Sequence, residues 1–224
     1  IGFCPEGDVH LLEETKKSGY NIQYLEKTRI IQNNHNRFNN RLIFPIHSIS
    51  GQVLGFGARI LEENTKKAKY LNSDSSEIYQ KSKVLYGLHL AKKHIKNSDF
   101  CYIVEGYTDV MALSQSGIKN VVSNCGTALT KEQIRLIKRF TNNIVILFDS
   151  DLAGVNATIK AIDSILEQNM SPKILQLPNH EDPASFIQNN TIEFVKEYLV
   201  DNTVDFIDFK YNLSNSTDSS ALIR

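Results

Sequence analysis

The sequence contains few of the residues that mark zinc-binding proteins. Its 224 residues include three cysteines, Cys4, Cys101 and Cys125, which are widely spaced and form no CxxC pair. The six histidines are scattered, and no HExxH pattern is present. An odd, dispersed cysteine set fits a reducing cytosol and argues against a zinc site. We therefore expect a cytoplasmic protein whose residues bind no zinc.

The sequence also lacks a long apolar run and an internal repeat. No stretch is long enough to cross a bilayer, and nothing near the N-terminus resembles a signal peptide. We expect no membrane association. The first residue is Ile1 rather than Met, which suggests a fragment or a processed chain. The length is large for one minimal domain, so two lobes are plausible.

Charge is balanced overall but unevenly distributed. Residues 1–98 carry 15 Lys and Arg against 9 Asp and Glu, a net charge of +6, and the remainder carries the opposite, −6. A basic half joined to an acidic half suggests contact with a polyanion on one side and with cations on the other. Ordinary variation among surface residues explains the same charge counts equally well. The charge distribution alone therefore does not identify a binding partner.

Hydrophobic patterning divides the chain into two kinds of structure. Residues 11–27 read as helical with a break near Ser18, and residues 41–59 read as a hairpin that turns at Gly51. Pro45 places its strand at a sheet edge there, and the Gly55–Gly57 pair favours a β-bulge over a phosphate loop. From residue 100 onward, apolar strands alternate with helices, which predicts a parallel sheet with right-handed crossovers.

Acidic residues follow two of these predicted strands. Glu105 closes the apolar run 100–104, Asp149 and Asp151 close the run 143–148, and Asp109 follows at the start of a helix. Ligands of open parallel sheets bind at the carboxyl ends of the strands, where converging carboxylates suit Mg²⁺. Taken alone, Asp151 reads as a helix N-cap and Asp109 as an acid favoured by the helix dipole. Together, the acids predict metal-assisted phosphate chemistry.

Two motifs resemble those of the Toprim fold, which bacterial primases, topoisomerases and some nucleases share: residues 104–110 (VEGYTDV) and 148–154 (FDSDLAG). The preceding lobe is similar to the RNA-polymerase domain of bacterial DNA primases of the DnaG type. That similarity is carried by residues 37–46 (RFNNRLIFPI), 51–59 (GQVLGFGAR), 69–73 (KYLNS), 79–81 (YQK), 85–88 (LYGL) and 123–127 (SNCGT). It runs in collinear order from about residue 1 to residue 189.

The resemblance implies an α/β fold, with a Toprim-type parallel sheet flanked by helices and preceded by a smaller, mixed α+β basic lobe. The basic lobe is expected over residues 1–98, the Toprim subdomain over 99–190 and the start of a C-terminal helical segment over 191–224. It also implies the roles of individual residues. Glu105 matches the catalytic glutamate, and the residues matching the metal site are Asp109, Asp149, Asp151 and Asp182. The residues matching nucleotide and nucleic-acid positions are Arg59, Lys69, Tyr70, Asn72, Lys81 and Gly106.

The same resemblance implies the activity and its partners. Short RNA primers would be made on single-stranded DNA from nucleoside triphosphates, with Mg²⁺ as cofactor and Mn²⁺ able to substitute. Arg59 and Lys69 would contact the triphosphate, and Tyr70 would stack on a base or ribose. In the family, the replicative helicase binds through a module that these residues do not contain. Two positions depart from the family pattern: Ala184 stands where a second acid is common, and Leu152 where a basic residue is common.

Three other functions share part of this pattern. Another Toprim enzyme, such as a nuclease, would not need the lobe containing Arg59 to Asn72, and a topoisomerase would need a separate strand-passage domain. A receiver-type phosphoacceptor also places Asp residues at parallel strand ends around Mg²⁺, but its acids follow the first strand of a shorter chain. A catalytically silent nucleic-acid-binding fragment also stays open as an alternative, because an acid is missing at Ala184.

Overall fold

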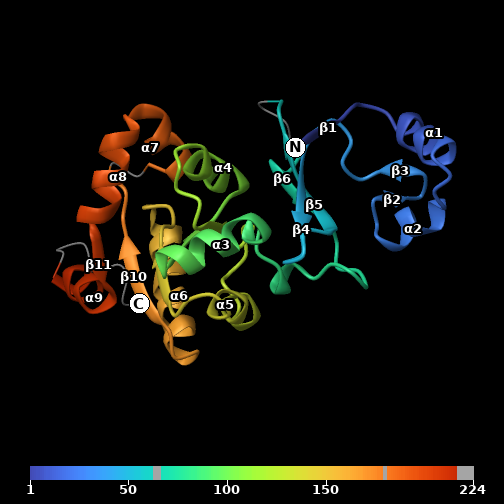
Figure 1. Cartoon of the computed structure of the whole chain (residues 1–224). Coiled ribbons are helices and arrows are strands. Elements are labelled where there is room, and N and C mark those ends of the chain that lie inside the picture. Colours follow the sequence, from blue (N-terminus) through green and yellow to red (C-terminus); the bar gives the residue numbers. More distant parts are fainter. Residues whose placement is uncertain (63–66, 179–180, 216–224) are drawn as a thin grey trace. The chain divides into compact units, whose positions relative to one another are not determined.

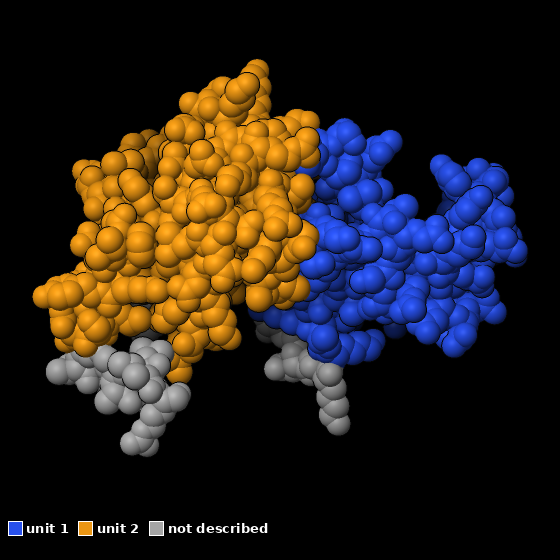
Figure 2. All heavy atoms as spheres, turned by 90° about the horizontal axis from the view of Figure 1, so that it is seen from below, with its two compact units in different colours: residues 1–84 blue, residues 85–224 orange. Residues whose placement is uncertain are grey.

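The structure is a computed structural model that describes residues 1–62, 67–178 and 181–215. The chain forms two compact units, Ile1–Val84 and Leu85–Arg224 (Figures 1 and 2). This division lies before the boundary predicted at residue 98, because the helix at residues 88–98 contacts the strand at residues 121–123 in the second unit. Every helix among the described residues is too short or too polar to span a membrane.

The first unit is built around an antiparallel sheet with the strand order β1-β4-β5-β6. A two-stranded sheet, β2-β3, lies beside it with two short helices. The elements are β1 (Gly2–Cys4), α1 (Val9–Lys17), α2 (Ile22–Lys27), β2 (Ile31–Gln32), β3 (His35–Asn36), β4 (Arg41–His47), β5 (Val53–Ile60), β6 (Tyr70–Asn72) and the 3₁₀ helix η1 (Lys81–Lys83). The predicted hairpin and the break between two N-terminal helices are both confirmed.

Local chemistry explains the irregular points of this sheet. β1 pairs only with Arg41–Ile43 of β4, so Pro45 lies where β4 has an unpaired edge, as predicted. The β4–β5 register shifts at Ile46, and Leu54 is the extra residue of a bulge beside Gly55. A Cβ at Gly55 would lie 2.9 Å from the ring of Tyr79. Gly55 therefore allows the Tyr79 ring, which is 1% exposed, to pack closely on β5.

The second unit contains a mostly parallel sheet with the strand order β11-β10-β9-β7-β8. β8, β7, β9 and β10 are parallel to one another, and only β11 runs antiparallel to its neighbour. The elements are α3 (Leu88–Ser98), β7 (Cys101–Val104), α4 (Tyr107–Gln115), β8 (Val121–Ser123), α5 (Lys131–Lys138), β9 (Asn143–Ile146), α6 (Leu152–Glu167), β10 (Ser171–Leu175), α7 (Pro183–Asn189), α8 (Ile192–Asp201), β11 (Thr203–Asp205) and α9 (Phe206–Asn215).

The core of this unit forms where the apolar strands meet the helices around them. All four residues of β7 are buried, as are Ile144 to Phe148 in and after β9. α3 and α4 contact β8, whereas α6 and α9 contact β10. The predicted α/β fold with a parallel sheet flanked by helices is therefore confirmed. Because the strands are parallel, Glu105, Asn124 and the segment after β9 lie at the same edge of the sheet.

Capping residues account for several helix boundaries. The Thr130 side chain accepts a hydrogen bond from Gln133 N at 3.1 Å, and Gln133 Oε1 accepts one from Thr130 N at 3.0 Å. This reciprocal capping box starts α5 at Lys131. Several short elements were not predicted from the sequence, among them β6, α7 and β11. Each is short, and each is stabilised by partners distant in the sequence.

Candidate active site

Glu105 follows β7 directly and is held from both neighbouring strands. Its backbone oxygen accepts hydrogen bonds from Ser123 Oγ at 2.7 Å and from Gly126 N at 3.1 Å. Its carboxylate oxygen Oε1 accepts one from Asp149 N at 3.3 Å. Ser123 is the last residue of β8 and is fully buried. The side chain of Glu105 is therefore positioned at the carboxyl edge of the sheet by the segments after β8 and β9.

Asp109 is a buried carboxyl group in the first turn of α4. Its Oδ2 atom accepts a hydrogen bond from Gly106 N at 2.9 Å, and the backbone N–H of Ala184 also donates to its carboxylate. Asp109 is only 6% exposed. Burial, with smaller contributions from the charges of Asp182 and Asp149, raises the pKa of Asp109 to about 6. Asp109 thus connects the start of α4 to the start of α7, which α4 contacts.

Asp151 and Asp182 both cap helices, as the simpler interpretation of Asp151 predicted. Asp151 Oδ1 accepts a hydrogen bond from Gly154 N at 2.7 Å, and Asp182 Oδ1 accepts one from Ser185 N at the same distance. Asp149 lies in the turn between β9 and α6. Burial raises the pKa of Asp149, and the charges of Asp182 and Asp151 add to the effect. Capping leaves one carboxylate oxygen of each N-cap aspartate unused by the cap.

In the structure, the negative charges of the five predicted acids act on one another. Burial raises the pKa of Glu105, and the negative charges of Asp149, Asp151 and Asp109 raise it further. None of the ion pairs between described residues involves Glu105, Asp109, Asp149, Asp151 or Asp182. Such an uncompensated group of carboxylates has the donor chemistry that a divalent cation requires. Within the described residues, however, no three acids are already arranged to hold one ion, so ligation requires side-chain rotation.

This charge cluster predicts an unusual dependence of stability on pH. The folded chain retains protons that the unfolded chain releases, so its free energy of unfolding should fall as pH rises from about 4 to about 6. The pKa of an unperturbed aspartate is 3.8, and that of Asp109 in the folded chain is about 6. This difference contributes on the order of 3 kcal/mol to the loss of stability. Urea unfolding at several pH values, with metal chelated and with excess Mn²⁺, measures the effect.

The variant Asp109→Asn provides the control for this measurement. It should have a weaker dependence on pH in the same range, and Mn²⁺ should restore stability to the original protein at neutral pH. A free energy of unfolding that increases from about pH 5 to about pH 7 without metal would contradict the electrostatic assignment.

Gly154, which was not predicted as a site residue, shapes the turn that carries Asp149 and Asp151. A Cβ at residue 154 would lie 2.0 Å from the backbone oxygen of Asp149 and 2.8 Å from its carbonyl carbon. No side chain fits in that space. A glycine in the first turn of a helix was the available signal, since glycine is otherwise unfavourable in a helix.

The predicted nucleotide-binding residues of the first unit lie mainly on two paired strands. Arg59 of β5 pairs in register with Tyr70 of β6, and its guanidinium carbon lies 5.7 Å from the centre of the Tyr70 ring. Asn72 pairs with Gly57 on the same strands, and Lys69 directly precedes β6. Tyr70 is therefore a strand residue, and its side chain is exposed.

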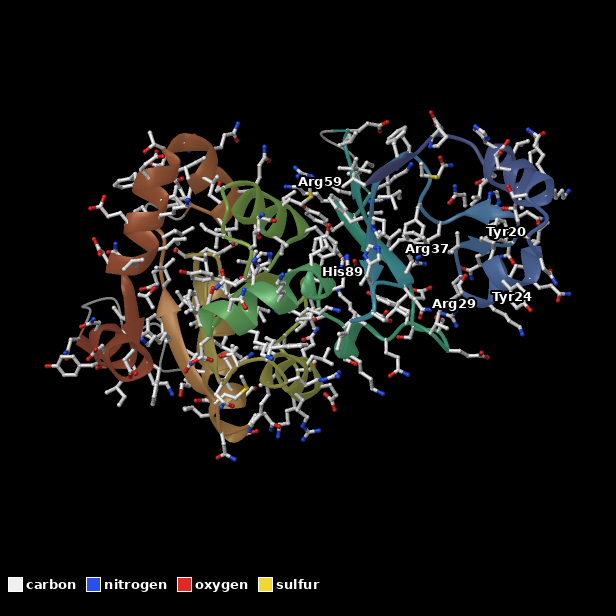
Figure 3. The ribbon with its side chains drawn as sticks, viewed as in Figure 1. Tyr20, Tyr24, Arg29, Arg37, Arg59 and His89 are labelled. Carbon is white, nitrogen blue, oxygen red and sulfur yellow. The ribbon has the colours of Figure 1, made fainter. Side chains whose placement is uncertain are left out.

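Lys81 and Gly106 lie in different surroundings from this strand pair. Lys81 begins the 3₁₀ helix η1, and Gly106 is the N-cap of α4 in the second unit. Arg37 was not predicted as a site residue. Its Nη2 atom donates to Asp74 Oδ1 at 2.7 Å and to Asn72 O at 3.3 Å. Figure 3 labels Arg37 and Arg29, which both pair with Asp74. These contacts fix the end of β6 that carries Asn72.

Comparison with known proteins follows the division into two units. Residues 1–92 match the family model described as the DNA primase catalytic core, N-terminal domain, and residues 102–187 match the Toprim-like model. The RNA polymerase domain of Mycobacterium tuberculosis primase DnaG superimposes with a TM-score of 0.87 at 30% identity. This match covers 100% of the present chain and 76% of that structure. The chain belongs to the DNA primase family.

Other primases agree with this assignment. A DNA primase of Clostridium acetobutylicum is 39% identical over 100% of this chain and 38% of its own length. A DnaG primase catalytic domain solved with bound single-stranded DNA superimposes with a TM-score of 0.81 at 33% identity, covering 94% of this chain and 68% of that structure. The chain thus spans about two fifths of the first curated relative that it matches. The predicted family resemblance is confirmed, and as a primase core with a Toprim domain the chain is expected to use divalent metal.

Proposed function

We propose that this chain is the catalytic part of a DNA primase, which joins ribonucleotides into short RNA primers on single-stranded DNA. The observation that carries the proposal is the convergence of five carboxylates at the carboxyl edge of the sheet. It occurs in a chain whose two units match the primase core in order. The acids would serve phosphoryl transfer, which depends mainly on positioning and electrostatic stabilisation.

The acidic residues would divide the work at the reaction centre. Asp109, Asp149, Asp151 and Asp182 would hold Mg²⁺ or Mn²⁺, which lowers the pKa of an attacking hydroxyl and neutralises charge on the triphosphate. Glu105 would act as the catalytic carboxylate and accept a proton from the 3′-hydroxyl of the growing primer. Gly106 has no side chain, so the backbone there could approach a ligand closely.

The first unit would bind the negatively charged substrates. Arg59 and Lys69 would contact the triphosphate, and the Tyr70 ring would stack on a base or ribose. Asn72 and Lys81 would contact nucleotide or template. A primase relative has been solved with single-stranded DNA, which supports such a template for this chain. Phosphate contacts would make template binding sensitive to salt and only weakly dependent on sequence.

The domain organisation follows from the same proposal. Residues 1–98 would form the basic lobe, although its last helix, α3, packs within the second compact unit. Residues 99–190 would form the Toprim subdomain and 191–224 the start of a helical segment. In the longer relatives, the replicative helicase would bind to a module outside the region that matches this chain.

Calorimetry with ATP and Mn²⁺ tests the nucleotide site directly. The double variant Asp149→Asn, Asp151→Asn should lose about a hundredfold in affinity, because two charged ligands are removed. Asparagine retains an oxygen that can cap α6, so the helix start is preserved. Asp163→Asn is the matched control, since Asp163 is an exposed acid of α6 paired with Lys210.

The outcomes separate the candidate functions. Metal-dependent binding that is lost only in the double variant supports the nucleotide site. If both folded proteins fail to bind ATP with Mn²⁺, these acids do not assemble a nucleotide site in this chain, and a nuclease or a non-catalytic binding fragment becomes the better interpretation.

A further inference from the structure

Ser123, the last residue of β8, is a polar residue with 0% exposure, and its backbone is held from both sides. Val104 of β7 pairs with it in register on one side. On the other side, Tyr86 N donates to Ser123 O at 2.9 Å, and Ser123 N donates to Tyr86 O at 3.1 Å. The Ser123 side chain therefore projects from a rigid part of the sheet, which is the kind of element that positions a site precisely.

The Ser123 hydroxyl connects two backbone groups at the carboxyl edge of the sheet. Its Oγ donates to Glu105 O at 2.7 Å and accepts from Cys125 N at 2.9 Å. One hydroxyl can make both hydrogen bonds, because it carries one donor and two acceptor sites. Replacing Ser123 with Ala would remove the shorter hydrogen bond to Glu105 O and take away this acceptor from the Cys125 N–H.

The turn that follows Ser123 has an unfavourable backbone conformation. Cys125 has a φ of 61° and Gly126 a φ of 68°, and a residue with a Cβ rarely adopts such a left-handed conformation. Conformations of this kind persist where surrounding contacts fix them. Ser123 Oγ fixes the Cys125 N–H, and the next residue, Gly126, donates its N–H to Glu105 O at 3.1 Å. The hydroxyl therefore supports both of these hydrogen bonds to Glu105 O.

The carboxylate of Glu105 is held less firmly than its backbone. Among the described residues, the hydrogen bond that its carboxylate accepts comes from Asp149 N at 3.3 Å. That distance exceeds the usual range for such a bond, about 2.7–3.2 Å. The position of the carboxylate thus depends on where the Glu105 backbone lies. A displacement of about 1 Å in a reacting group can slow catalysis by about a hundredfold.

We propose that Ser123 is a positioning residue for primer synthesis and acts through the backbone of Glu105. This role rests on the proposed function, in which Glu105 is the catalytic carboxylate. Ser123 would contact neither nucleotide nor metal, because it is fully buried and its hydroxyl bonds to two backbone groups. Loss of the hydroxyl should therefore slow the chemical step and leave nucleotide binding unchanged.

The variant Ser123→Ala tests this role through separate effects on kcat and KM. In dinucleotide synthesis on a single-stranded template with Mn²⁺, kcat should fall about tenfold or more. The KM for nucleotide and the calorimetric affinity for ATP with Mn²⁺ should stay within about twofold of the original values. An unchanged kcat in the folded variant would overturn the proposal, as would a loss of ATP affinity as large as the loss of kcat.

Ser116→Ala is the matched control. Ser116 is another buried serine of the second unit, and its Oγ donates to a backbone oxygen, Ala112 O, at 3.0 Å. It lies at the end of α4 rather than beside Glu105. Ser116→Ala should lose stability to urea as Ser123→Ala does but retain the original kcat. Equal decreases of kcat in the two variants would overturn the proposal, because a loss of stability alone would then explain the effect.

A double-mutant cycle with Glu105→Gln shows whether Ser123 acts through Glu105. Ser123→Ala should slow the original chain but cause no further decrease when Glu105 is already Gln, since the group that Ser123 positions has then lost its function. Equal relative decreases in both backgrounds would overturn the proposal.

Ser123→Cys keeps the role testable if Ser123→Ala does not fold. A thiol is close in size to a hydroxyl but is a weak donor, so the same decrease in kcat with unchanged ATP affinity is expected. A folded Ser123→Cys protein with the original kcat would overturn the proposal. If the original chain makes no primers, the proposed function itself is wrong, and the role of Ser123 is wrong with it.

Discussion

Replacing Glu105 with Gln is expected to reduce primer synthesis by a factor of about 10² to 10⁴, the range measured for a lost general base. Glutamine has the same shape and retains an oxygen that can accept from Asp149 N, as Glu105 does at 3.3 Å. The fold should therefore be unchanged while the proton acceptor is lost. The measurement is single-turnover dinucleotide formation on a single-stranded template with saturating Mn²⁺.

A second glutamate provides the comparison for this variant. Glu197 is an exposed residue of α8, so Glu197→Gln should retain the original rate. A Glu105→Gln protein that makes primers at the original rate would show that Glu105 is not the catalytic base. If the original chain makes no primers under the same conditions, the proposed activity itself fails for these residues.

Gly154→Ala is expected to destabilise the chain by about 1–3 kcal/mol, the usual effect of overpacking. Alanine at an ordinary helical position would instead stabilise it by about 1 kcal/mol, because alanine is the better helix former. The sign reverses here because the added Cβ would lie 2.0 Å from the backbone oxygen of Asp149. Urea unfolding measures the change in free energy, and calorimetry with ATP and Mn²⁺ should show that nucleotide binding is lost as the turn opens.

Gly2→Ala is the matched control for the glycine substitution. A Cβ at Gly2 meets no atom within 4 Å, so its effect on the free energy of unfolding should stay within about 0.5 kcal/mol. If Gly154→Ala is as stable as the original chain and binds nucleotide normally, the turn does not require glycine, and the close approach described here is wrong.

Local pattern was sufficient for most of the second unit. The apolar runs that became β7 and β9 are long enough to be recognised as buried strands, and the intervening amphipathic segments became helices. The acids Glu105, Asp149 and Asp151 could be placed at one edge because the carboxyl ends of parallel strands coincide. Thr130 could be predicted as an N-cap because capping involves only neighbouring residues.

Short elements and close contacts could not be predicted in the same way. β6 and β11 have three residues each, too few to show a periodic pattern, and they form because distant strands supply their hydrogen bonds. The raised pKa of Asp109 depends on burial and on charges from Asp149 and Asp182, which are far away in the sequence.

The residue types and their order were thus enough to indicate the chemistry, because carboxylates at strand ends follow from local pattern and sheet geometry. The positions of those carboxylates and the need for glycine at residue 154 were decided by tertiary structure. Each of these depends on distances between segments separated by many residues, and such distances are set by packing rather than by neighbouring residues in the chain.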